Sequence, residues 1–214
     1  MNTRTMSTTC LSRNTMAVAL LLATSFVANG QAFENGTSVV SLGLGITNYP
    51  VGYTYTYGYG YYYDYTYDAG IAPALSANYE MGVAKLGPDH LGIGATVQFS
   101  GKKHEERYLY STVDWRSSYI AFGVRANYHF NWFHHIDKLD LYAGVLAGGG
   151  IGNSKWKVTS NSGGALLSEN NDSKFRPHLD VLIGARYYFT DVIGVYCEFG
   201  ELNTYANLGL SLKF

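Results

Sequence analysis

Hydrophobic and polar residues alternate over the last eight residues of the chain, from Asn207 to Phe214. The even-numbered positions form an apolar face: Leu208, Leu210, Leu212 and Phe214. The odd-numbered positions form a polar face: Asn207, Gly209, Ser211 and Lys213. Because successive side chains of a strand point to opposite sides, this pattern predicts a β-strand with one apolar and one polar face.

Seven earlier segments alternate in the same way, near residues 38–48, 71–82, 90–100, 119–130, 139–148, 179–189 and 193–200. No charged residue enters the apolar face of any of them. A tilted strand of about 9–11 residues crosses a bilayer, and only a closed barrel satisfies all its backbone groups in lipid. The pattern therefore predicts an all-β fold, an antiparallel up-and-down transmembrane β-barrel of eight strands.

The predicted connections alternate between short and long. Short ones fall near residues 84–89, 131–138 and 190–191, and long loops near 49–70, 101–116 and 153–176. Outer-membrane barrels have short periplasmic turns and long external loops. We therefore expect the three long loops to be external and both termini to be periplasmic.

The N-terminal segment has the pattern of a secretory signal peptide. Arg4 and Arg13 precede the apolar run Met16–Ala23, and Gly30 and Ala32 offer small residues before a cleavage site. Residues 1–32 are predicted to be removed, which leaves a barrel domain over residues 33–214. The apolar run is too short for a transmembrane helix.

The composition is consistent with alternating strands, since 47% of residues are hydrophobic and only 14% are charged. The net charge of −1 gives no electrostatic basis for binding nucleic acid. Cys197 is the only cysteine left after cleavage, so no internal disulfide is expected. We predict no cofactor and no metal site, because the His134–His135 pair falls in a predicted turn.

The signal peptide, the alternating strands, the turn at Tyr187–Asp191 and the C-terminal Phe214 pattern together resemble the small outer-membrane β-barrel family. This family includes opacity-type porin-like surface antigens and the OmpX and OmpA barrels. The resemblance implies a monomer in the bacterial outer membrane, in contact with outer-membrane lipid and lipopolysaccharide. It also implies an assembly signal, read by the barrel-assembly machinery, at Asn207, Gly209, Leu212 and Phe214. Its members act mostly as adhesins, surface antigens or structural barrels.

The inward faces of the predicted strands carry a set of charged residues: Glu80, Arg125, Asp140, Asp180, Arg186, Glu198 and Lys213. Charges inside a narrow barrel must pair or contact water, because an isolated buried ion is costly. We expect a plug of ion pairs, with Arg125 and Asp140 on adjacent strands as its principal pair. The alternative is a proton or ion path through a narrow pore.

Tyrosine occupies every odd position of the first long loop: Tyr53, Tyr55, Tyr57, Tyr59, Tyr61, Tyr63, Tyr65 and Tyr67. An extended strand would place these rings on one face. One hypothesis is a hairpin that turns near Gly58–Tyr61 and prolongs the first two strands; the alternative is a flexible low-complexity segment. In either form, tyrosine-rich surfaces suit adhesion to an extracellular protein or glycan.

A lipid-modifying enzyme is the competing class of function. His178 and Asp180 share a strand face, but no serine lies beside them in a G-x-S-x-G nucleophile motif. We therefore predict that the chain is not an enzyme and has no catalytic residues. The sequence favours adhesion, surface recognition or envelope structure.

Overall fold

The computed structural model describes residues 32–47, 55–57, 61–63, 72–131, 136–202 and 204–214. The predicted signal peptide therefore lies outside the described residues, apart from Ala32. Within the described residues, no helix is long and apolar enough to cross a membrane.

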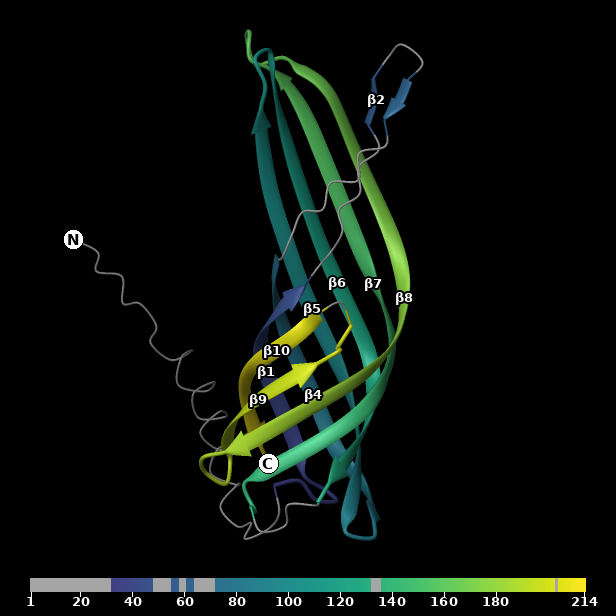
Figure 1. Ribbon diagram of the computed structural model, residues 1–214, viewed down its shortest axis with the longest axis vertical. Coiled ribbons are helices and arrows are strands. Elements are labelled where there is room, and N and C mark those ends of the chain that lie inside the picture. Colours follow the sequence, from purple (N-terminus) through teal and green to yellow (C-terminus); the bar gives the residue numbers. More distant parts are fainter. Residues whose placement is uncertain (1–31, 48–54, 58–60, 64–71, 132–135, 203) are drawn as a thin grey trace, which may run out of the picture.

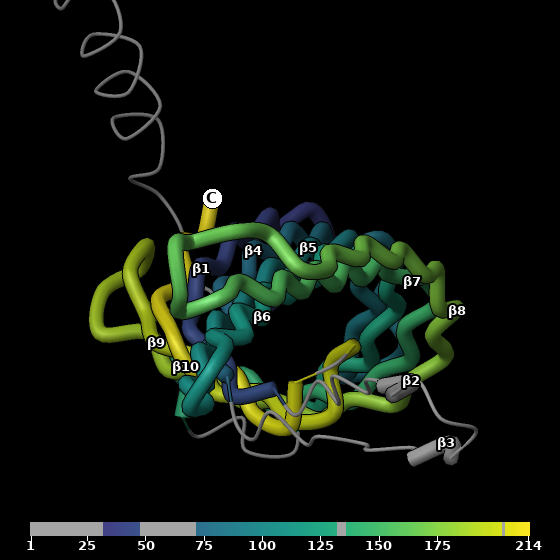
Figure 2. Tube along the Cα trace, turned by 90° about the horizontal axis from the view of Figure 1, so that it is seen from above, coloured from purple at the N-terminus to yellow at the C-terminus, as the bar shows by residue number. Residues whose placement is uncertain are grey.

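Eight antiparallel strands close into a ring in the order β1-β10-β9-β8-β7-β6-β5-β4 (Figures 1 and 2). Their bounds are β1 (Ser38–Thr47), β4 (Ala72–Leu86), β5 (Asp89–Arg107), β6 (Ser111–Phe130), β7 (Leu139–Ser160), β8 (Leu166–Tyr188), β9 (Ile193–Phe199) and β10 (Thr204–Lys213). The first and last strands close the ring, for example at Leu44 opposite Leu208. The predicted eight-stranded up-and-down barrel is confirmed.

The alternation of the sequence separates the outside of the barrel from its interior. On β6, Val124 is 66% exposed, whereas its neighbour Arg125 is 3% exposed. Outward apolar residues of β5–β8 form a continuous apolar belt, which ends on one side at the cross-strand row Phe99, Ile120, Ile151 and Phe175. Near its other side, aromatic pairs join Tyr128 to Phe130 and Tyr187 to Phe189, with ring centroids 5.1 Å and 5.6 Å apart.

Four strands continue well beyond this belt, where the sequence pattern predicts loops near 101–116 and 153–176. β5 pairs with β6 as far as Arg107 opposite Thr112, and β7 pairs with β8 as far as Thr159 opposite Leu166. We call the paired part of β5–β8 beyond the belt the strand extension (Figure 1). The loop prediction is wrong for these segments because the outward positions, which are apolar within the belt, are polar beyond it, as at Lys103 and Arg116. The apolar outward face that marks the belt strands in the sequence therefore ends before the backbone pairing does.

The first long connection contains a small sheet of its own. Strands β2 (Tyr55–Tyr57) and β3 (Tyr61–Tyr63) pair antiparallel, with Tyr55 opposite Tyr63 and Tyr57 opposite Tyr61. This pairing agrees with one part of the hairpin hypothesis, but β2 and β3 form a two-stranded sheet separate from the barrel, so among the described residues they do not prolong its first two strands. The remainder of residues 48–71 lies outside the described part of the chain.

The segment before β1 folds against one end of the barrel. The backbone N–H of Gly36 donates a hydrogen bond to the carbonyl of Gly82 at 2.9 Å, and the N–H of Gly82 donates one to the carbonyl of Thr37 at 2.9 Å. Phe33 is 4% exposed and its ring is stacked on His129, with centroids 3.6 Å apart. This end of the barrel is thus covered by the chain itself, opposite to the strand extension.

Candidate functional site

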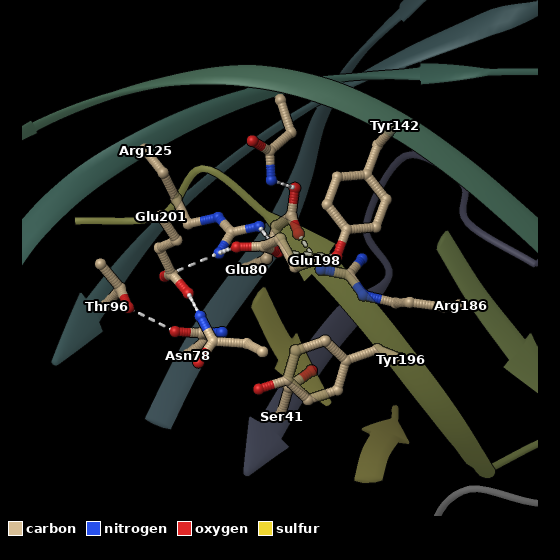
Figure 3. A network of polar contacts seen from close by, with 12 residues as sticks. Ser41, Asn78, Glu80, Thr96, Arg125, Tyr142, Arg186, Tyr196, Glu198 and Glu201 are labelled. Atoms are coloured by element: carbon tan, nitrogen blue, oxygen red, sulfur yellow. Dashed lines mark hydrogen bonds and ion pairs between the residues drawn. The ribbon is translucent and has the colours of Figure 1, made fainter. Parts of the chain in front are cut away.

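The barrel interior holds a network of buried ionic side chains drawn from five strands (Figure 3). In its first part, Glu80 on β4 accepts from Asn127 Nδ2 at 2.7 Å and lies 2.8 Å from His129 Nε2. Arg186 on β8 donates to Glu80 Oε2 and, at 3.1 Å, to Asp140 Oδ2. His129 Nδ1 lies 2.7 Å from Asp140 Oδ1, so both imidazole nitrogens face carboxylate oxygens.

In the second part of the network, Arg125 binds two glutamates. Its guanidinium donates to both carboxylate oxygens of Glu198, at 3.0 Å and 2.7 Å, and to Glu201 Oε1 at 3.2 Å. Such bidentate contact fits the planar fork of arginine. Asn207 Nδ2 donates to the other oxygen of Glu201 at 2.9 Å. These four side chains link β6, β9, β10 and the loop between the last two.

Tyr142 on β7 joins the two parts. Its hydroxyl donates to Glu198 Oε2 at 2.7 Å, and its ring lies 4.3 Å from the Arg186 guanidinium carbon and 5.8 Å from that of Arg125. The three side chains are buried. Arginine over an aromatic face is stabilised by cation–π attraction. The network therefore spans the barrel as a connected polar plug.

The predicted Arg125–Asp140 pair is wrong. Cross-strand register places Leu146 opposite Arg125, and Arg186 opposite Asp140. Arg125 instead pairs with Glu198, three strands away around the ring. The sequence suggested adjacent partners, but a narrow barrel lets long side chains meet across its axis.

Five of the seven predicted interior charges lie in this network: Glu80, Arg125, Asp140, Arg186 and Glu198. The other two lie apart from it. Asp180 Oδ2 is 3.8 Å from His178 Nδ1, and the Lys213 ammonium lies 4.8 Å from the centre of the Tyr188 ring.

Sequence reasoning missed Glu201, which the alternation along β9 would place outside. Gly200 has a positive φ of 86° and redirects the chain into the barrel. Such a φ favours glycine, so a glycine directly before an acidic residue was the one available signal. Asn127 shares the inward face of β6 with Arg125, and alternation alone does not reveal its contact with Glu80.

The residues predicted to form the assembly signal lie on β10 and just beyond its end. Asn207 is buried in the interior, whereas Phe214 is exposed. Gly209 packs against the backbone of Leu42, so an added Cβ would overlap that carbonyl. Leu212 lies opposite Val40, and the backbone of Phe214 exchanges two hydrogen bonds with Ser38, at 2.8 Å and 3.0 Å. These contacts close the ring.

Tyr55, Tyr57, Tyr61 and Tyr63 of the predicted tyrosine surface lie on β2 and β3. Tyr53, Tyr59, Tyr65 and Tyr67 lie outside the described residues. Among the described residues, no group of three or more His, Cys, Asp or Glu side chains could hold a metal ion.

The strand extension carries aromatic residues on the face that continues the barrel interior. Register places His104, Trp115, Trp156 and Asn170 in one cross-strand row on β5–β8. The rings of His104 and Trp115 are stacked with centroids 5.5 Å apart. Lys102 lies on the same face, one row closer to the barrel.

No protein-family model matches the chain, and no curated protein matches it. A solved structure of Ail, the attachment invasion locus protein of Yersinia pestis, in complex with the heparin analogue sucrose octasulfate, matches with a TM-score of 0.51. The two are 16% identical, and the match covers 85% of this chain and 100% of the other. The chain shares the barrel fold of Ail.

Two further solved structures match with TM-scores below 0.5. Another crystal structure of Ail of Yersinia pestis matches with a TM-score of 0.47 and 13% identity, and the match covers 85% of this chain and 100% of the other. Neisserial surface protein A matches with a TM-score of 0.39 and 15% identity, and the match covers 84% of this chain and 96% of the other.

Proposed function

We propose that this chain is a bacterial outer-membrane surface protein that serves adhesion or surface recognition. In this proposal the barrel is a sealed holder, and recognition belongs to the strand extension and to the tyrosine-rich segment Tyr53–Tyr67. The observation that carries the proposal is the contrast between the two regions. The interior is filled by a buried ionic network, whereas β5–β8 stay paired beyond the belt with polar and aromatic side chains.

The proposed orientation follows from this contrast. The apolar belt occupies the membrane, and the strand extension with β2 and β3 lies outside the cell. Both chain ends then lie in the periplasm, because Phe33 and Phe214 lie at the barrel end opposite to the extension. Cleavage after Ala32 and recognition of the C-terminal strand by the barrel-assembly machinery are parts of the same proposal.

The ligand class is an anionic glycan or an extracellular protein. Residues 101–118 and 153–176 hold eight Lys or Arg and five Asp or Glu, although the whole chain has a net charge of −1. Aromatic rings stack on sugars and cations attract sulfate groups, and both occur on the strand extension. The Ail structure with a heparin analogue makes sulfated glycans the first ligands to test.

The competing functions have less support. A pore would require the Arg125–Glu198 and Arg186–Glu80 pairs to exchange partners inside the barrel, where removing a partner is costly. A lipid-modifying enzyme would require a nucleophile at His178. That imidazole faces the hydroxyl of Tyr119 and the carboxylate of Asp180.

The test is adhesion of cells that display the protein at equal, confirmed surface levels. The variants are a deletion of Tyr53–Tyr67, a replacement of the eight odd-numbered tyrosines of that segment by threonine, and the pair Trp115→Ala with Trp156→Ala. The panel contains heparin-coated surfaces, matrix proteins and sister cells. We expect adhesion to fall at least several-fold with the deletion and with the threonine variant.

The threonine variant separates ring chemistry from loop length. Loss of adhesion in the deletion variant alone would assign adhesion to the length of the segment. Loss of adhesion in the double tryptophan variant alone would assign recognition to the strand extension. Unchanged adhesion in all three variants would contradict the proposed function.

A further inference from the structure

Three positive side chains from three strands share one cross-strand row. Lys103 on β5 lies opposite Arg116 on β6, which lies opposite Lys155 on β7. All three point outward, on the same face as Phe99, Ile120 and Ile151 of the apolar belt. Like charges placed directly opposite one another on a sheet are destabilising. We call these three residues the cationic row.

The cationic row lies at a defined height above the belt. It is four residues along each strand from the row that contains Phe99, Ile120 and Ile151, and the one row between them on the outward face is uncharged. At a rise of about 3.3 Å per residue and a strand tilt near 40°, this separation is about 10 Å along the barrel axis. The polar headgroup region of a bilayer occupies this zone, and long side chains extend toward it.

The row borders a groove on the outward face. Asp114, Arg116, Lys155 and Lys157 line a volume of about 170 Å³. Acidic residues lie on the side away from the belt, where Lys155 pairs with Glu169. On the side toward the belt, the adjacent row is Gly101, Ser118, Asn153 and Ser173, which leaves the approach from the membrane free of acidic side chains.

A second hollow lies on the same strands within the apolar belt. It has a volume of about 540 Å³, and its floor includes three alanines: Ala95, Ala126 and Ala147. Larger side chains flank it, among them Tyr79, Ile93 and Leu179. Ala95 precedes Lys103 by eight residues on β5, or about 20 Å along the barrel axis, a distance comparable to an extended acyl chain.

The geometry points to a binding site for one phosphorylated glycolipid of the outer leaflet on the outward face of β5–β7. Lys103, Arg116 and Lys155 bind its phosphate groups, and one acyl chain occupies the alanine-lined hollow. The lipid is favoured over a soluble polyanion because the row, the groove and the hollow all lie on the membrane-facing side. The inference rests on the outer-membrane placement of the proposed function.

The test measures lipid retention by the purified, refolded protein. The probe is diphosphorylated lipid A, and lipid A with both phosphates removed is the comparison lipid. After detergent washing, native mass spectrometry counts the lipids that remain bound. We expect the unmodified barrel to retain about one diphosphorylated molecule and at least tenfold less of the dephosphorylated form. A wash with excess inorganic phosphate should leave the lipid bound.

Two variants and a matched control define the site. Lys103→Gln with Arg116→Gln and Lys155→Gln should reduce retention at least tenfold, and Ala126→Phe, which fills the hollow, should reduce it several-fold. The control, Lys102→Gln with Lys174→Gln, removes cations from the opposite face of the same sheet and should retain lipid normally. Circular dichroism confirms folding of each variant.

The site would be overturned if the triple variant retained as much lipid as the unmodified barrel, or if the control lost as much lipid as the triple variant. Normal lipid retention by Ala126→Phe alone would overturn the proposed position of the acyl chain. Loss of lipid in the phosphate wash would show that the site binds anions rather than the whole lipid. Because insertion into plain phosphatidylcholine bilayers is measured separately, failure of the membrane placement is distinguished from failure of the lipid site.

Discussion

The aromatic ring of Tyr142 lies against Gly184 on the neighbouring strand, at the centre of the barrel interior. A Cβ added at Gly184 would overlap this ring. The absence of a side chain there lets Tyr142 reach Glu198, to which its hydroxyl donates at 2.7 Å. An inward glycine thus positions a residue of the ionic network.

Gly184→Ala is therefore expected to reduce the free energy of unfolding by about 1–3 kcal/mol, the usual cost of overpacking. Gly101→Ala is the matched control, because its Cβ would meet no atom closer than 3.5 Å. Urea unfolding of the refolded barrel, followed by tryptophan fluorescence, measures both. Equal stability of the two variants would contradict this role of Gly184.

Arg125→Met should destabilise the barrel by about 3–5 kcal/mol, because it leaves Glu198 and Glu201 buried without their cation. Glu201→Gln should cost less, since Arg125 keeps both contacts to Glu198. The same unfolding measurement compares them. If Arg125→Met were as stable as the unmodified protein, the ionic network would not hold the interior together.

Phe33→Ala is expected to reduce the free energy of unfolding by about 3 kcal/mol, as burial of the ring and its stacking on His129 are lost. Phe33→Leu should retain most of the burial and part of the stability. Leu109→Ala, at a tip residue that is 81% exposed, should change stability by less than about 0.5 kcal/mol. An effect of Phe33→Ala no larger than that of Leu109→Ala would show that the N-terminal segment does not seal this end.

Asp89 provides a pH-dependent contact at the rim, outside the apolar belt. The Tyr128 hydroxyl donates a hydrogen bond to the Asp89 carboxylate at 2.6 Å, and the backbone N–H of Asn131 donates another at 2.8 Å. Together they hold the pKa of Asp89 below its ordinary value. A lowered folded-state pKa contributes stability that is complete above the unfolded-state pKa, about 3.9, and is lost as pH falls through the folded-state pKa.

Asp89→Asn should therefore be less stable than the unmodified barrel at neutral pH, and the difference should shrink as pH falls below about 4. Urea midpoints measured over this pH range test it. A difference that stayed constant with pH would mean that the charge of Asp89 has no part in the contact.

The outward face of the barrel could be predicted from the sequence because the belt selects apolar residues at every second position, as in Leu208 and Leu210. The strand extension could not, since the outward positions of its paired strands are polar, as at Lys103, Arg116 and Lys155. Backbone pairing continues there without the apolar outward face that marks the strands of the belt.

Membership of the interior network followed from alternation, but the partners did not. Alternation places Arg125 and Glu198 inside, whereas their pairing depends on strand tilt and on the width of the ring. Glu201 enters through the positive φ of Gly200, a local conformation that no periodic pattern contains. Partner choice in a narrow barrel is a property of its closed geometry.

Single-channel recording of the refolded barrel in a planar bilayer at neutral pH shows directly whether the interior is closed. We expect the interior to be sealed by five side chains, so that the barrel acts only as a holder for its external surfaces: Glu80, Arg125, Tyr142, Arg186 and Glu198. A sealed interior leaves the membrane silent once insertion of the folded protein has been confirmed. Steady, discrete openings would contradict it and would make transport through the barrel the function to pursue.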